Sequence, residues 1–255
     1  MITPFKGANF MKRMKTSILS IGLLIIGIIF VLSTLNNKIP DGPITKREDD
    51  KRIQASLNED KEIPHEIILD NGYGQSFNVS LSSIPNLEKY LEDELDKKLE
   101  IDRIQIEFLD WGIQYNNYFV LKYGCGNKIC NLILIQITTL NEVKTVYLGE
   151  GIYTDSEVFD KKSLLRITVN EGNNVVRHQI IIVDLITMSI ITPHDKSKEE
   201  LYFKAPLYPI TEFKWLTANT IELVVADIPN VTYESLDKWY KTTNPPLKRV
   251  EITIE

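Results

Sequence analysis

The segment that runs from Thr16 to Leu35 restricts the architecture of this chain more than any other feature. It holds twenty residues without a charged side chain, and Lys12, Arg13 and Lys15 stand just before it. Twenty residues of α-helix, at about 1.5 Å each, extend roughly 30 Å, the thickness of the hydrocarbon core of a bilayer. We therefore predict a transmembrane helix over residues 16–35, preceded by a short basic cytoplasmic segment over residues 1–15.

The flanking charges predict the orientation of this helix. Cytoplasmic flanks are enriched in Lys and Arg, which favours an inside N-terminus and a C-terminal domain outside the cell. The competing interpretation is a signal peptide with Val31 and Ser33 at a cleavage site. The apolar run exceeds the 7–15 residues usual for signal peptides, which favours a retained anchor. Either interpretation exports the domain, as a single-pass membrane protein or, after cleavage near Ser33, as a secreted one.

The charge is divided unequally along the chain. The formal net charge is −6, and residues 1–35 contribute +4, so the remainder carries −10. An acidic domain is a poor partner for nucleic acid, which is bound mainly through basic residues that contact phosphate. We therefore expect no nucleic-acid partner, and we expect contact with the membrane only through residues 16–35.

The residues after the anchor predict a linker and a small folded section. Prolines and a run of charged residues over 36–62 predict a charged linker. Residues 63–110 predict an α+β section of order ββαβ, in which Asn71-Gly72 is a strong hairpin signal. A helix with one apolar stripe should follow, since leucines recur at i+4 intervals. These leucines are Leu87, Leu91, Leu95 and Leu99.

Residues 111–255 predict a β-rich domain. Short apolar runs, separated by turn-forming residues, are typical of an antiparallel meander. They cover residues 118–123, 131–138, 143–149, 164–170, 175–185, 188–192, 212–216, 220–226 and 249–255. A weak blade-like repeat, with an offset of 47 positions between Ile135 and Ile182, favours a propeller-like or sandwich arrangement. There is room for about three blades, fewer than the 4–8 of typical propellers, so a closed ring is not expected.

Cys125 and Cys130 flank a predicted hairpin turn. Closing such a hairpin brings two Cβ atoms to disulfide distance, so we predict a structural disulfide, in keeping with export. Free thiols are the first alternative. A metal or redox site is the second, but the spacing is not C-x-x-C, and only three scattered His could complete a zinc site. The sequence therefore predicts neither a metal nor a cofactor.

Catalytic candidates are few. None of the three His lies in a metal-binding pair, and His178, inside a strand run, is most simply a core residue. Glu150, Asp155 and Glu157 lie in an acidic stretch that we expect to be a loop. Two of these carboxylates could act as acid and base on a glycosidic bond, or bind a partner. A plain solvated acidic loop is the simpler interpretation.

Aromatic residues supply the remaining binding candidates. Tyr233, Trp239 and Tyr240 lie in the irregular stretch 229–246, and long loops of this kind are often functional. Other aromatics gather between residues 111 and 123, where core packing is the simpler interpretation and stacking on a sugar or peptide the alternative.

Together these features predict a non-catalytic, membrane-anchored extracytoplasmic domain that binds a protein or a cell-envelope component. One alternative is an exported hydrolase that acts on a glycan or ester through the acidic carboxylates. The other is a structural accessory subunit of a membrane complex.

Overall fold

The computed structural model describes residues 64–114 and 116–254. The expected basic segment over 1–15, the helix over 16–35 with its alternative cleavage site near Ser33, and the linker over 36–62 lie outside the described residues. Within the described part, no helix has the length and apolar character needed to cross a bilayer.

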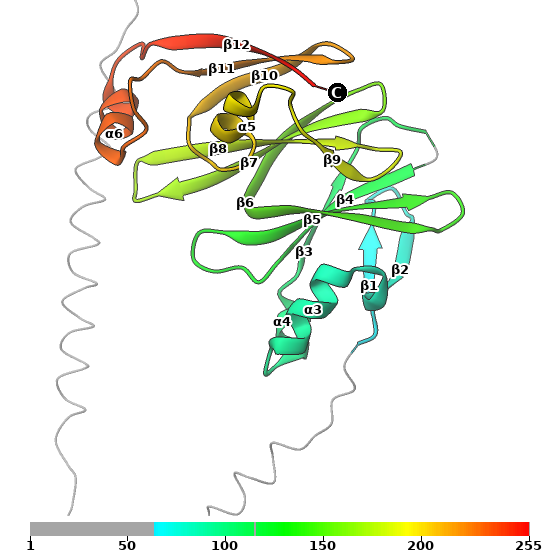
Figure 1. Ribbon diagram of the computed structural model, residues 1–255. Coiled ribbons are helices and arrows are strands. Elements are labelled where there is room, and N and C mark those ends of the chain that lie inside the picture. Colours follow the sequence, from blue (N-terminus) through cyan, green and yellow to red (C-terminus); the bar gives the residue numbers. More distant parts are fainter. Residues whose placement is uncertain (1–63, 115, 255) are drawn as a thin grey trace, which may run out of the picture. The chain divides into compact units, whose positions relative to one another are not determined.

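The described domain is built mainly from antiparallel strands, as predicted, and has three parts (Figure 1). The N-terminal part holds β1 (Glu66–Asp70), β2 (Ser76–Ser80), η1 (Leu81–Ser83), α3 (Pro85–Asp93) and α4 (Lys97–Asp102). A seven-stranded sheet follows, with its strands in chain order: β3 (Gln105–Leu109), β4 (Asn116–Tyr123), β5 (Cys130–Thr138), β6 (Val143–Phe159), β7 (Lys162–Glu171), β8 (Val175–Asp184) and β9 (Ser189–Ile191). The third part holds α5 (Lys196–Tyr202), α6 (Tyr233–Lys241) and a sheet of β10 (Ile210–Thr217), β11 (Thr220–Ala226) and β12 (Leu247–Thr253).

Strands β4, β5, β7 and β8 each contain consecutive buried apolar residues because both faces of their sheet are covered. Successive residues of a strand point to opposite faces. In β5, Leu132 and Leu134 join one core cluster, while Ile133 and Ile135 join another. A strand that is buried on both faces needs apolar residues at odd and even positions alike, which explains the long runs in the sequence.

The seven-stranded sheet bends at β6. This 17-residue strand pairs with β5 up to Gly151 and with β7 from Ile152 onward. Shifts of register along both pairings mark bulges, which bend a strand. Gly151 has φ +153°, and a Cβ there would stand 2.4 Å from Cγ2 of the buried Ile167. The bend therefore requires glycine at this position.

The bend brings the two halves of the sheet together around an inner cluster, to which both contribute. Val120 and Leu134 come from the first half, and Leu165 and Val183 from the second. Between the halves, Gln136 Nε2 donates a hydrogen bond to the carbonyl of residue 185 at 3.0 Å. This inner cluster fixes the two halves face to face.

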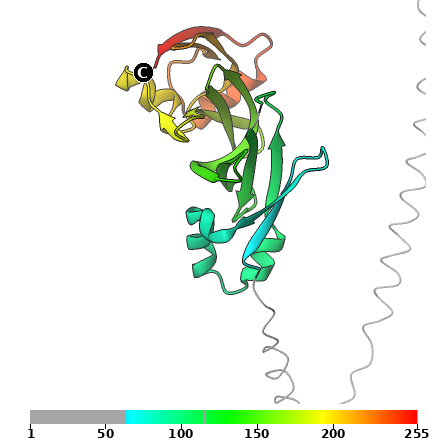
Figure 2. The ribbon, with the colours of Figure 1, turned by 90° about the vertical axis from the view of Figure 1, so that its right-hand side faces the viewer.

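The outer face of each half has its own cover (Figure 2). β1, β2 and α3 cover the first half, where Leu69 and Leu87 meet Phe119. The three-stranded sheet and α5 cover the second half, where Leu223 and Tyr202 meet Ile180. The domain is consequently a stack of layers, formed by the two halves of the seven-stranded sheet and their outer covers. The turns between strands lie at the ends of these layers.

The blade-like repeat takes a different form from the one we expected. Its first two copies, β4–β6 and β7–β9, are joined through β6 in a single sheet, whereas propeller blades are separate sheets. Propeller-like blades are therefore not supported. Within the described residues the seven-stranded sheet stays open, with β3 and β9 as its edges.

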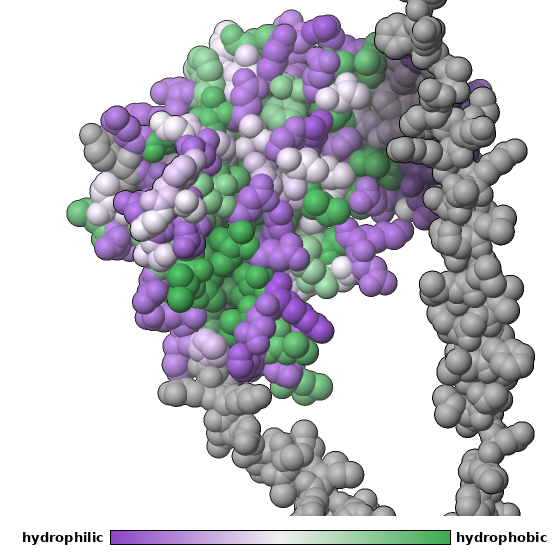
Figure 3. Space-filling view, turned by 180° about the vertical axis from the view of Figure 1, so that it is seen from behind, coloured by the Kyte–Doolittle hydropathy of each residue, from purple (hydrophilic) through white to green (hydrophobic). Residues whose placement is uncertain are grey.

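The predicted single helix over Leu87–Leu99 is wrong. α3 ends at Asp93, and a second helix begins at Lys97 because the Asp96 side chain caps it by accepting a hydrogen bond from the Leu99 nitrogen at 2.9 Å. Leu95 in the connection is fully exposed. β3 then pairs with β4, so the last strand of the small section belongs to the large sheet. The rear face shows hydrophobic residues gathered over the half of the domain that holds these elements (Figure 3).

Candidate functional site

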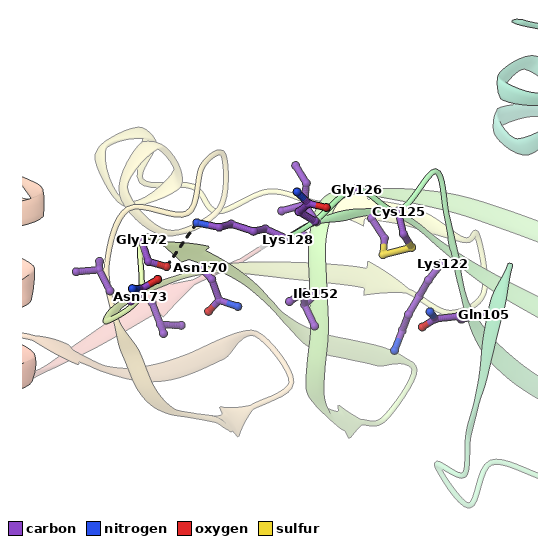
Figure 4. Close-up of a pocket in the computed structure, with 15 residues that line it drawn as sticks. Gln105, Lys122, Cys125, Gly126, Lys128, Ile152, Asn170, Gly172 and Asn173 are labelled. Atoms are coloured by element: carbon purple, nitrogen blue, oxygen red, sulfur yellow. Dashed lines mark hydrogen bonds between the residues drawn. A yellow bond between two sulfur atoms is a disulfide. The ribbon is translucent and has the colours of Figure 1, made fainter. Parts of the chain in front are cut away.

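An open groove of about 760 Å³ lies where β4 ends and β5 begins. Its lining comes from segments far apart in the sequence: the β4–β5 turn at 124–129, the start of β3, the bend of β6 and the β7–β8 turn at 172–174 (Figure 4). The bend of the sheet at β6 brings the two turns to the same site. Its volume falls in the range of roughly 300–1,000 Å³ typical of ligand sites.

The disulfide predicted between Cys125 and Cys130 is present and forms one wall of this groove. It closes the β4–β5 turn, which begins at Gly124 with φ +56°. A Cβ on Gly124 would stand 2.9 Å from Nδ2 of Asn131 and 3.1 Å from the Tyr90 ring. The turn is thus held by a covalent bond and by close packing, which limits its movement on ligand binding.

Lysines are the charged residues among the described residues that line the groove. Lys128 extends from the disulfide turn to the β7–β8 turn, where Nζ donates to the Gly172 carbonyl at 3.5 Å (Figure 4). Lys122 Nζ forms an ion pair with Glu107 at 2.7 Å and lies 5.9 Å from the centroid of the Tyr153 ring. Because Glu107 balances the charge of Lys122, Lys128 supplies the positive charge of the groove.

Side-chain amides supply most of the remaining polarity. They belong to Gln105, Asn127, Asn170 and Asn173. Each amide carries two donor hydrogens and an acceptor oxygen. Together with the lysines, they can bond a ligand that presents carbonyl, hydroxyl or anionic oxygen atoms.

The predicted binding stretch 229–246 is ordered and contains α6. Trp239 is buried, and its Nε1 donates to the Pro246 carbonyl at 2.9 Å. Thr232 caps the helix by accepting from the Ser235 nitrogen. Trp239 therefore stabilises the stretch itself and is not an exposed contact residue.

Tyr233 and Tyr240 support the groove from behind. Tyr240 Oη donates to the carbonyl of Val176, a groove residue, at 2.6 Å, and burial raises the pKa of this tyrosine to about 12. The Tyr233 ring packs on Gly172, where a Cβ would stand 3.0 Å from Tyr233 Oη. Both tyrosines thus hold the β7–β8 turn in place.

The acidic candidates lie on a strand, because β6 continues through the segment that we expected to be a loop. Asp155 forms an ion pair with Arg166, whose Nε and Nη2 donate to the two carboxylate oxygens at 2.8 and 2.5 Å. Glu150 is exposed and lies on the other side of the bend at Gly151 from Asp155. Glu157 is half-buried further along the same strand. Nowhere in the described residues do three His, Cys, Asp or Glu groups gather to hold a metal ion.

His178 is a structural residue of β8, as expected. Its backbone nitrogen donates to the Tyr208 carbonyl at 2.9 Å, and its ring Nδ1 accepts from the Ile210 backbone nitrogen at 2.9 Å. Burial, with a smaller contribution from the charge of Arg166, lowers the pKa of His178 to about 4. The neutral imidazole therefore joins the seven-stranded sheet to the segment that leads into β10.

Comparison of the chain with protein-family models, with curated proteins and with solved structures found no match. The site is therefore defined by its geometry alone. Sequence reasoning identified the turn at Cys125 and Cys130 and separated the runs 164–170 and 175–185, between which the second turn lies. It did not single out Lys122, Lys128, Asn170 or Asn173. The turns could be predicted from the sequence, but their proximity could not, because it depends on the bend at β6.

Proposed function

We propose that this chain is a membrane-anchored extracytoplasmic domain that binds a protein or a component of the cell envelope without catalysing a reaction on it. The anchor is the apolar segment over residues 16–35, and the binding surface is the groove at the disulfide turn. The groove carries the proposal, because it has the size of a ligand site and a polar lining held in place by the fold.

The disulfide supports an extracytoplasmic location. Disulfides persist in oxidising compartments and are reduced in the cytosol. The bond between Cys125 and Cys130 forms a wall of the groove, so the oxidising environment would also preserve the shape of the binding surface.

The lining favours a ligand with anionic or carbonyl oxygen atoms. Lys128 is exposed at the centre of the groove, and rim charges of this kind steer a partner of opposite charge. The amides of Asn170 and Asn173 lie at the β7–β8 turn that Lys128 reaches, where they can fix the orientation of the bound group.

Site-specific cross-linking in cells tests this proposal. A photoreactive amino acid in place of Asn173, which is exposed in the groove, should cross-link one partner. The same amino acid in place of Lys161, an exposed residue of the β6–β7 turn, should give no product. Lys128→Glu should weaken the cross-link from position 173 several-fold, whereas Lys161→Glu should not. Equal products from both positions, or a product unaffected by Lys128→Glu, would contradict the proposal.

A further inference from the structure

A second cavity of about 510 Å³ lies at the opposite end of β4 and β5. Asn116 pairs with Thr138 at this end, and Tyr123 pairs with Asn131 at the groove end. Eight residues of β4 separate the two sites by about 25 Å. The lining comes from the β1–β2 turn, the segment 109–113, the first residues of β4 and the β5–β6 turn.

Tyr73 stands at the mouth of this cavity and is 72% exposed, yet it is held in place. Its hydroxyl donates to Asp110 Oδ2 at 2.9 Å, and its ring meets Phe108 edge to face with centroids 5.9 Å apart. The hydrogen bond to Asp110 raises the pKa of the Tyr73 hydroxyl. An exposed tyrosine in a turn usually rotates freely, so two contacts with residues distant in the sequence give a pre-positioned aromatic surface.

Trp111 is a second fixed ring of the lining. Its Nε1 donates to Ser156 Oγ at 2.9 Å, and its ring lies tilted against Tyr118 with centroids 4.9 Å apart. Its indole N–H is therefore used within the protein, and the ring contributes apolar surface to the cavity. Because Tyr118 is buried in the inner cluster, the position of Trp111 depends on the core and not on a flexible loop.

The rest of the lining is rich in neutral polar groups. Amides and hydroxyls come from Gln75, Asn116, Asn117, Thr138, Thr139 and Asn141. The Asn71 amide also belongs to the lining, but it is used within the protein, where it bonds Tyr73, Gln75 and Asn117. Asp110 is the single charged residue among the described residues of this lining. Without a lysine or arginine, the cavity offers nothing to neutralise a phosphate or carboxylate. The chemistry therefore suits an uncharged ligand that has both a hydrogen-bonding edge and an apolar face.

We propose that this cavity binds a neutral saccharide. A pyranose ring has a face of C–H groups that stacks on an aromatic side chain, here Tyr73 or Trp111, and a rim of hydroxyls that amides can bond as donors and acceptors. A proline-rich peptide also packs on aromatic rings, but it presents few hydrogen-bonding groups. The many amides and hydroxyls of the lining therefore favour the sugar. This inference rests on the proposed function, to which it adds the class of envelope ligand. It concerns the cavity at Tyr73 and not the groove at the disulfide turn.

Binding measurements on the full chain test the inference. The protein is kept in a polyoxyethylene detergent, because maltoside and glucoside detergents would compete as sugars. It is titrated by calorimetry with a panel of neutral tetrasaccharides built from glucose, galactose, mannose or N-acetylglucosamine, and with a proline-rich decapeptide. At least one tetrasaccharide should bind, and Tyr73→Ala should weaken its binding about tenfold, the loss expected for one stacked ring. Tyr73→Phe retains the ring and should weaken it less.

Controls separate this inference from the groove. Tyr73 is mostly exposed, so Tyr73→Ala should lower the unfolding midpoint only slightly, by the loss of its contacts with Asp110 and Phe108, and the protein should stay folded. Tyr233→Ala, at the other end of the domain, should leave saccharide binding unchanged, and Tyr73→Ala should leave the cross-link from Asn173 unchanged. No binding by any member of the panel, binding that Tyr73→Ala does not weaken, or binding of the decapeptide alone would each overturn the inference.

Discussion

Acid should weaken the link between the two sheets through His178. Neutral Nδ1 accepts a hydrogen bond from the Ile210 nitrogen at 2.9 Å. Protonation turns Nδ1 into a donor that faces another donor, the Ile210 N–H. It also places a buried positive charge near Arg166. The folded state therefore resists protonation, and the unfolded chain binds the proton at a higher pH.

The size of the effect follows from the pKa. Folding lowers the pKa of His178 from 6.5 to about 4. Each pKa unit corresponds to about 1.4 kcal/mol, so the contribution to unfolding free energy is complete above pH 6.5 and falls as the pH drops toward 4. The expected loss is roughly 1 kcal/mol at pH 5.5 and roughly 2–3 kcal/mol at pH 4.5.

Urea unfolding at pH 7.5, 5.5 and 4.5 measures this loss. Carboxylates titrate over the same range, so the wild-type chain is compared with His178→Gln, whose amide oxygen can accept from Ile210 but does not titrate. The wild-type chain should lose more stability than the variant between pH 7.5 and 4.5, by roughly 2–3 kcal/mol. Equal losses in the two proteins would refute the role assigned to His178.

Three variants test other parts of the fold. Gly151→Ala should lower the unfolding free energy by about 1–3 kcal/mol in urea denaturation, since its Cβ would meet Ile167 at 2.4 Å; no loss would contradict the bend at β6. Trp239→Ala should cost about 3–5 kcal/mol by the same assay, because this ring is buried, and a loss below 1 kcal/mol would show α6 to be loosely packed. Replacing Cys125 and Cys130 with serine should cost about 2 kcal/mol, the loop-closure value for so short a loop, and the unfolding midpoint should then no longer respond to reductant.

The sequence predicted strands better than it predicted their arrangement. Each of the nine apolar runs between residue 118 and the C-terminus overlaps a strand, because burial in a sheet produces a strong local pattern. The bend at β6 left no such pattern, since it arises from bulges and from one glycine that packs on Ile167. The acidic stretch that contains Asp155 was therefore predicted to be a loop.

Helices were predicted less well than strands. The leucine spacing predicted one helix to Leu99, but the capping preference of Asp96 divides it in two. α5 is short, begins at the Asp195 cap and has few apolar residues, so its period was not visible. The binding candidates Trp239 and Tyr240 were predicted from loop length. Tertiary packing instead makes Trp239 a support of its own segment and Tyr240 a support of the groove.

Protease treatment of intact, wall-stripped cells tests the outward-facing anchored domain most directly. An antibody against residues 64–254 follows the domain after a brief exposure to protease, with permeabilised cells and a cytosolic marker as controls. The domain should be cleaved from intact cells while the cytosolic marker survives, and permeabilisation should add little further loss. A domain that stays intact until the membrane is opened, then disappears together with the cytosolic marker, would contradict an extracytoplasmic location.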